Sequence, residues 1–125
     1  MTKLNKLSFA LWVFVLLSVT IGSLLPLNKV PNEAFMMGDK FLHLTAYLAI
    51  GTLALLGSRY RKAQVGLLGI SFGVSVLIEF VQPLTGRSFE LMDILANGTG
   101  LFVAIPLVSY AIYPLIKRYI LNINN

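Results

Sequence analysis

The chain has 125 residues, of which 57% are hydrophobic and only 12% are charged, and its mean hydropathy is +0.81. Polar residues are too few to cover the surface of a soluble domain of this size, so the composition indicates a membrane protein. The net charge of +5 does not indicate nucleic-acid binding, because the basic residues flank apolar segments instead of forming one basic face. The absence of cysteine excludes disulfides, thiol catalysis and cysteine-ligated zinc.

Four stretches without charged residues indicate membrane-spanning helices, because each approaches or exceeds the roughly 20 residues that a helix needs to cross the hydrocarbon core. The stretches are residues 7–28, 41–58, 63–78 and 94–116. Turn residues such as Pro83 and Gly86 separate the helices. We predict helices at about residues 7–26, 38–57, 63–82 and 90–117.

The first predicted helix has an alternative interpretation. Lys3 and Lys6 before an apolar run are also typical of a cleaved signal peptide. The apolar run continues through Leu24 and Leu25, however, and contains no A-x-A-like cleavage site. We therefore expect a retained transmembrane helix, followed by a connection bounded by prolines.

The third and fourth helices are expected to contact each other. Both carry small residues at spacings of three or four, which let helix backbones approach closely in lipid. These residues are Gly66, Gly69 and Gly73 on the third helix, and Ala96, Gly100 and Ala104 on the fourth. Pro106 cannot donate a hydrogen bond to the preceding turn, so we expect a kink in the fourth helix.

The distribution of charge predicts the orientation in the membrane. Seven basic residues form three groups that contain no acidic residue: Lys3, Lys6, Arg59, Arg61, Lys62, Lys117 and Arg118. By the positive-inside rule these groups are cytoplasmic, which places residues 28–40 and 83–92 outside. The sequence thus predicts an all-α, polytopic protein of the cell membrane. We expect one domain over residues 1–125, with four transmembrane helices in a compact bundle and both termini cytoplasmic.

Polar residues on three of the predicted helices are expected to lie in one layer near the outer surface. Asp39, His43 and Tyr47 share one face of the second helix, because they are spaced four residues apart. Glu79 and Asn97 each lie about one turn inside the outer end of their helices. Ionisable groups in lipid cost from about 2.5 kcal/mol each, so we expect them to face one another in a shared pocket. The candidate site residues are Asp39, Lys40, His43, Tyr47, Glu79, Gln82, Arg87, Asp93 and Asn97.

Short motifs follow one another through this part of the chain. They are D-K-x-x-H from Asp39, E-x-x-Q from Glu79, G-R from Gly86 and D-x-x-x-N-x-x-G from Asp93. In this order they resemble the VanZ-like family of small bacterial integral membrane proteins, over residues 39–100. The resemblance implies a role in the cell envelope, because the family is named after a protein associated with low-level teicoplanin resistance in Gram-positive bacteria. It implies no particular reaction.

Two classes of function fit an outward polar pocket. The first, favoured by the resemblance, is an envelope accessory protein that binds a cell-wall precursor or lipid-linked component, with Arg87 and Lys40 contacting its anionic group. The second is a membrane-embedded hydrolase or transferase acting on a lipid head group, with His43 as general base and Glu79 as proton donor. In that case the catalytic candidates are His43, Glu79 and Asp93.

Other functions are less favoured by the sequence. We expect no cofactor, since a divalent metal at His43, Glu79 and Asp93 would rely on one histidine and scattered carboxylates. A proton path is disfavoured, because the inner halves of the second, third and fourth helices lack ionisable residues. A purely structural role, in which polar contacts hold the helices together, stays open. The expected partners are membrane lipids, the cell-wall or lipid-linked ligand and a second copy of the chain, and not nucleic acid.

Overall fold

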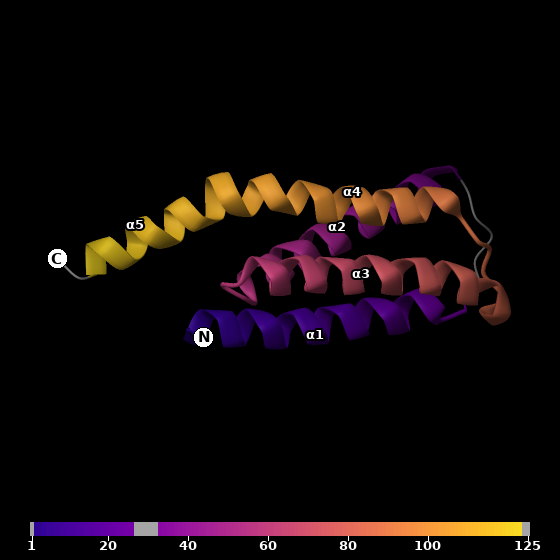
Figure 1. Ribbon diagram of the computed structural model, residues 1–125. Coiled ribbons are helices and arrows are strands. Elements are labelled where there is room, and N and C mark those ends of the chain that lie inside the picture. Colours follow the sequence, from indigo (N-terminus) through magenta and orange to yellow (C-terminus); the bar gives the residue numbers. More distant parts are fainter. Residues whose placement is uncertain (1, 27–32, 124–125) are drawn as a thin grey trace.

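The computed structural model describes residues 2–26 and 33–123, and within them all regular structure is helical. The elements are α1 (Lys3–Leu24), α2 (Glu33–Leu56), α3 (Arg61–Val81), the 3-10 turn η1 (Gln82–Thr85), α4 (Leu91–Pro106), the π-helical turn η2 (Leu107–Ile112) and α5 (Tyr113–Ile123) (Figure 1). Four segments are long and apolar enough to cross a membrane: Lys3–Leu24, Met37–Leu56, Arg61–Thr85 and Leu91–Tyr119. The prediction of an all-helical protein with four candidate spans is confirmed. The predicted connection after Pro26 falls largely on residues 27–32, outside the described residues.

α1 begins at Lys3, earlier than the predicted start near residue 7, because the residues before the apolar run form a helix cap. The Thr2 hydroxyl accepts a hydrogen bond from the Asn5 backbone N–H at 3.2 Å, and the Asn5 side chain accepts one from the Thr2 backbone at 3.1 Å. This reciprocal pair satisfies backbone donors that the first turn leaves free. The two lysines therefore belong to the helix itself.

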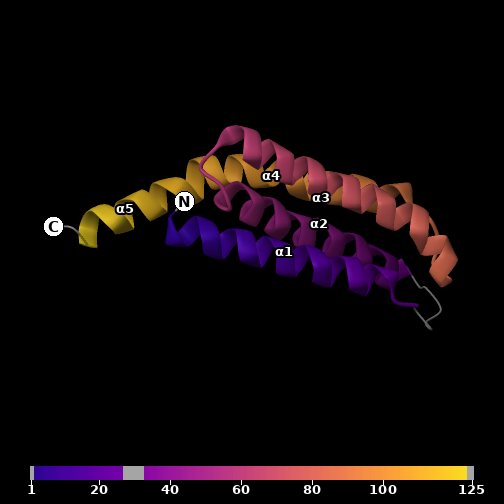
Figure 2. The same ribbon diagram turned by 60° about the horizontal axis from the view of Figure 1, so that its bottom comes forward.

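α2 is the central helix of the molecule. It contacts α1, α3 and α4, and its contact with α4 is the most extensive in the structure (Figures 1 and 2). The main apolar cluster is built around it from Trp12, Leu16, Tyr47, Ile50, Ala54 and Leu101. The polar side chains of α2 are therefore surrounded by the other helices.

Two glycines allow α2 and α4 to approach each other. A Cβ atom added at Gly100 would lie 2.8 Å from the backbone nitrogen of Leu48, and one added at Gly51 would lie 2.8 Å from the Cβ of Ala104. A Cβ atom does not tolerate such distances, so the close contact of α2 with α4 requires glycine at both positions. The small residues predicted to pack on the fourth helix do form a close helix contact, but with α2 instead of α3.

The predicted glycine row on the third helix makes no such contact, which corrects the packing expected from sequence. Gly66, Gly69 and Gly73 are exposed, and a Cβ atom added at each would meet no described atom within 4 Å. α3 and α4 do contact each other, as predicted, but through Ser75 and Asn97 and through Phe72 against Gly98. The polar residues of α3 lie on the opposite face from the glycines and turn inward, because they cannot face lipid without a partner.

Pro106 does not end the fourth span. The helix continues through η2, where the Tyr113 backbone N–H donates to the Val108 carbonyl, and the axis bends between α4 and α5 (Figure 1). A π-helical turn lengthens the hydrogen-bond register by one residue, and π-helical turns and prolines are both common causes of a bend in a helix. α5 then projects beyond the other helices (Figures 1 and 2).

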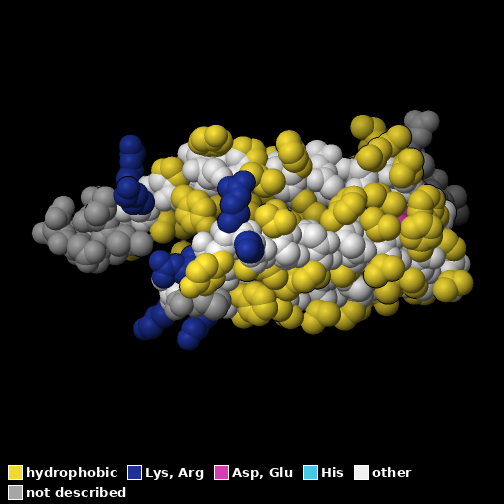
Figure 3. Space-filling view, viewed as in Figure 1, with side chains coloured by type: hydrophobic (Ala, Val, Ile, Leu, Met, Phe, Trp, Pro, Cys, Tyr) yellow, Lys and Arg dark blue, Asp and Glu magenta, His cyan; other side chains and the backbone are white. Residues whose placement is uncertain are grey.

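Basic side chains gather toward one end of the molecule. In Figure 3 the visible lysines and arginines lie toward the end where α1 begins and α5 ends, and the opposite half of this face is mainly apolar. All seven residues of the basic groups defined above are exposed. The turn between α2 and α3 lies at the same end (Figure 1).

Candidate functional site

The structure brings polar side chains of three helices together at the end of the molecule opposite the basic groups. α2 contributes Asp39, Lys40 and His43, α3 contributes Glu79, the turn η1 contributes Gln82, α4 contributes Asp93 and Asn97, and the connection before α4 contributes Arg87 and Glu90. Glu79 and Gln82 are 0% exposed, and Asp93 and Asn97 are 2% exposed. Such burial of ionisable groups requires partners close by.

His43 connects the three helices through a chain of hydrogen bonds. The Asn97 amide nitrogen donates to the Ser75 hydroxyl at 2.8 Å, and its carbonyl oxygen lies 3.0 Å from His43 Nδ1. With the Asn97 amide in this orientation, its oxygen faces Nδ1, which therefore carries a proton and donates to Asn97. His43 Nε2 then faces two carboxylates, 3.5 Å from Asp93 Oδ2 and 3.8 Å from Asp39 Oδ2.

Lys40 pairs with two acidic side chains of the protein itself. Its ammonium group lies 2.7 Å from Asp93 Oδ1 and also pairs with the Glu90 carboxylate. The predicted contact of Lys40 with a ligand would have to compete with these two acids. Glu90 was not among the predicted site residues, although its position one turn before Asp93 placed it on the same side of the fourth helix.

Glu79 and Gln82 make different contacts from those of the central cluster. Glu79 Oε2 accepts a hydrogen bond from the Glu90 backbone N–H at 3.1 Å, and its Oε1 has no hydrogen-bond partner among the described residues. The Gln82 amide donates to the Ser23 carbonyl of α1 at 3.1 Å. Tyr47 is 1% exposed and belongs to the apolar cluster around α2.

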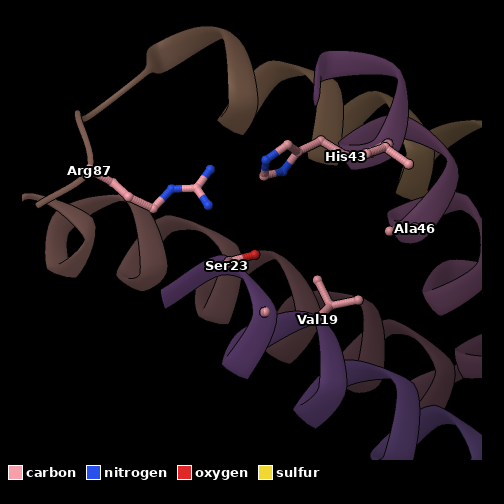
Figure 4. Close-up of a pocket in the computed structure, with 7 residues that line it drawn as sticks. Val19, Ser23, His43, Ala46 and Arg87 are labelled. Carbon is pink, nitrogen blue, oxygen red and sulfur yellow. The ribbon is translucent and has the colours of Figure 1, made fainter. Parts of the chain in front are cut away.

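A cavity of about 170 Å³ opens beside this cluster, between α1 and α2. Its lining residues are Val19, Gly22, Ser23, Leu42, His43, Ala46 and Arg87. The side chains of Arg87 and His43 extend toward each other from opposite sides of the cavity, with Ser23 and Val19 along α1 (Figure 4). The Arg87 guanidinium is 3.9 Å from Asp39 Oδ2, so it is only loosely paired. The contribution of α1 was not predicted, because its small and apolar residues resemble any other part of a transmembrane helix.

The sequence of the chain was also compared with known protein families. A sequence model of the VanZ/LLP1 family matches residues 3–117. The chain belongs to the VanZ/LLP1 family. The match extends from α1 into α5, beyond the residues that carried the resemblance in the sequence, so the helix that lines one side of the cavity is part of the family region. Comparisons with curated proteins and with solved structures found no match.

Proposed function

We propose that this VanZ-like protein is a multi-pass protein of the cell membrane that binds a lipid-linked or peptidyl cell-wall component in the cavity between α1 and α2. The cavity opens toward the outer surface, and both termini are cytoplasmic. The orientation is supported by the seven exposed basic residues at the opposite end, since such residues are retained on the cytoplasmic side.

The observation that carries the proposal is the composition of the cavity lining. Val19, Leu42 and Ala46 contribute apolar surface to the cavity, whereas Arg87 and His43 contribute polar nitrogen atoms that face each other across it. A lipid-linked molecule combines an apolar chain with an anionic head group, and a planar guanidinium binds phosphate or carboxylate through two parallel hydrogen bonds. The two kinds of surface in the cavity therefore match the two parts of such a ligand.

Among the basic side chains that the structure describes at this end, Arg87 is the one that remains available to a ligand. Lys40 pairs with Glu90 and Asp93, whereas Arg87 has one carboxylate at 3.9 Å, beyond hydrogen-bond distance. We therefore assign recognition of the anionic group to Arg87 and not to Lys40. Glu79 bonds to the Glu90 backbone and not to His43, so its contacts do not support the acid–base pair that a hydrolase would need.

The test is native mass spectrometry of the protein released from bacterial membranes. We expect an anionic, lipid-linked species to remain bound at about one per chain. The Arg87→Gln variant should retain it about tenfold less, because a charge-assisted hydrogen bond contributes roughly 1.5–3 kcal/mol. Arg118→Gln is the matched control, since it removes the same charge at the opposite end. Equal loss in both variants, or binding of bulk membrane lipids only, would contradict the proposal.

The family resemblance adds a cellular readout. Expression of the protein in a Gram-positive host should lower susceptibility to teicoplanin, and Arg87→Gln should abolish the effect while Arg118→Gln preserves it. Membrane levels of all variants have to be equal, because a loss of protein would produce the same phenotype. Unchanged susceptibility with the wild-type protein at normal levels would contradict an envelope role of this type.

A further inference from the structure

Three side chains at the edge of the cavity place one ligand atom each around a common point. His43 Nε2 lies 3.5 Å from Asp93 Oδ2 and 3.8 Å from Asp39 Oδ2, and a ligand atom from each of the three residues lies within 4.8 Å of the others. These separations are too long for hydrogen bonds between a nitrogen and a carboxylate. We infer that Asp39, His43 and Asp93 form a binding site for a divalent transition-metal ion of the Zn²⁺ type.

The orientation of His43 is the first support. The Asn97 oxygen faces Nδ1 and accepts its proton, and neutral His43 then has its lone pair on Nε2. The side chain of His43 is 9% exposed, and the Nε2 atom has no hydrogen-bond partner among the described residues. An oxygen acceptor on the other ring nitrogen is the arrangement that positions metal-binding histidines.

The spacing of the three atoms is the second support. Ligands lie about 2.0–2.2 Å from Zn²⁺, so two ligands on one tetrahedral ion are about 3.4 Å apart. The two nitrogen–oxygen separations of 3.5 and 3.8 Å are close to this value. The ligand oxygens of Asp39 and Asp93 lie within 4.8 Å of each other, so an ion bound between the three atoms would draw these two carboxylates together.

The charges around the site also fit a cation. The Lys40 ammonium holds Asp93 through Oδ1, at 2.7 Å, and leaves Oδ2 directed to His43. Glu90 pairs with the same Lys40 and balances its charge. The Arg87 guanidinium, 3.9 Å from Asp39 Oδ2, is the group that opposes the ion most directly. The alternative without an ion is a protonated His43 that attracts both carboxylates.

The donor set indicates which ions bind. One imidazole and two carboxylates favour Zn²⁺ or Mn²⁺ over Mg²⁺ and Ca²⁺, which prefer ligands that are all oxygen. Three protein ligands also leave a coordination position open, as in zinc sites that bind a further molecule. Since His43 lines the cavity, the ion would lie at its edge, near the place proposed for an anionic group. The sequence, in contrast, led us to expect no metal, and the disfavoured metal set considered there combined Glu79 with His43 and Asp93.

The test uses protein without a histidine tag, purified in detergent, stripped with a chelator and titrated with Zn²⁺ alone. We expect about one ion per chain by calorimetry and by metal analysis after dialysis, and a tetrahedral ligand-field spectrum when Co²⁺ replaces Zn²⁺. Asp39→Asn and His43→Ala should each weaken Zn²⁺ binding by tenfold or more. Glu90→Gln is the matched control, because it removes a carboxylate of the same cluster that is not a ligand, and its affinity should change by less than about threefold.

The outcomes separate this inference from the proposed function. Arg87→Gln should lose the lipid yet bind Zn²⁺ at least as tightly as wild type, because a competing positive charge is removed. If His43→Ala does not fold, Asp39→Asn decides, since Asp39 is partly exposed and tolerates the change better. Less than half an ion per chain, equal loss in Glu90→Gln and Asp39→Asn, or an octahedral Co²⁺ spectrum would overturn the metal site.

Discussion

The two ends of the helix assembly use polar side chains in opposite ways. At the end where α1 begins, neutral amides bind backbone carbonyls: the Asn5 amide donates to Leu56 at 2.8 Å, and the Gln64 amide donates to Leu55 and Ser58 at 2.8 Å each. The basic residues there are exposed. At the other end, charged groups are buried and pair with one another. We call these the basic end and the mixed-charge end.

The basic end shows that the helices do not need buried charges to be held together. Neutral donors satisfy the last carbonyls of α2 at low desolvation cost. Burying ionisable groups at the mixed-charge end costs from about 2.5 kcal/mol each, and polar contacts between transmembrane helices return less than about 2 kcal/mol. At the mixed-charge end the cost of burial exceeds the stability that such contacts return. This excess is the physical reason to assign a function to that end and not to the basic end.

The largest expected effect concerns the side of the membrane on which each end lies. In this cysteine-free chain, single cysteines at the exposed positions of Ser88 and Tyr60 report on the mixed-charge end and the basic end. An impermeant thiol reagent should label Ser88→Cys in intact cells and label Tyr60→Cys only after lysis. The reverse pattern would place the cavity on the cytoplasmic side and end the envelope proposal.

A second prediction concerns the stability of the charged network. Asp93→Ala removes a buried carboxylate and leaves Lys40 and His43 without their partner, which should lower the free energy of unfolding by about 3 kcal/mol. Arg59→Ala at the basic end should change it by less than about 0.5 kcal/mol. The measurement is reversible unfolding in mixed micelles.

A double variant sharpens this result. Lys40→Met combined with Asp93→Leu removes both charges of the pair and should recover much of the stability that Asp93→Ala loses. If the single and double variants are equally unstable, packing of the side chains and not pairing of charge holds this end together.

A smaller effect is expected from the neutral contacts at the basic end. Gln64→Ala removes the donor to Leu55 and Ser58 and should lower the free energy of unfolding by about 1 kcal/mol, because water can reach the freed carbonyls. Lys62→Ala, two residues earlier on an exposed position, is the control and should have almost no effect. A loss as large as that of Asp93→Ala would remove the contrast between the two ends.

The sequence predicts well where the candidate spans lie and which residues share a level along the helices, because hydrocarbon excludes charged residues from the interior of a span. The charge-free stretches locate all four candidate spans, and residues at equal depth, such as His43 and Asn97, are neighbours in the structure. Depth alone also predicted that acidic groups of α2 and α4 would lie in one layer. These parts of the fold follow from a single physical rule.

The rotation and pairing of the helices could not be predicted in the same way. They depend on side-chain packing, in which Gly100 contacts α2 while the glycines of α3 face outward. For the same reason Asp39, and not Glu79, completes the set with His43 and Asp93. The contribution of α1 has no sequence signal, since Ser23 uses its backbone carbonyl to accept the hydrogen bond from Gln82.

The smallest effect on stability, and the clearest separation of function from architecture, is expected at Glu79. Glu79→Gln keeps the shape of the side chain and an oxygen that accepts from the Glu90 backbone N–H, so the free energy of unfolding should change by less than about 1 kcal/mol. A neutral amide is also easier to bury than a carboxylate. The hydrolase or transferase alternative, in which Glu79 donates a proton, requires the teicoplanin phenotype to be lost, because the amide can neither ionise nor exchange a proton. In the binding proposal, where Arg87 holds the anionic group, the phenotype should persist.

Asn97→Ala is the companion variant. It removes the bridge between His43 and Ser75 without changing charge, so it should destabilise the protein more than Glu79→Gln does. Susceptibility and unfolding are measured for both variants at equal membrane levels. Full phenotype in Glu79→Gln together with unfolding of Asn97→Ala would show that these two residues hold the helices together, and it would exclude the acid–base alternative. Loss of the phenotype in a stable Glu79→Gln variant would contradict the assignment of recognition to Arg87 alone.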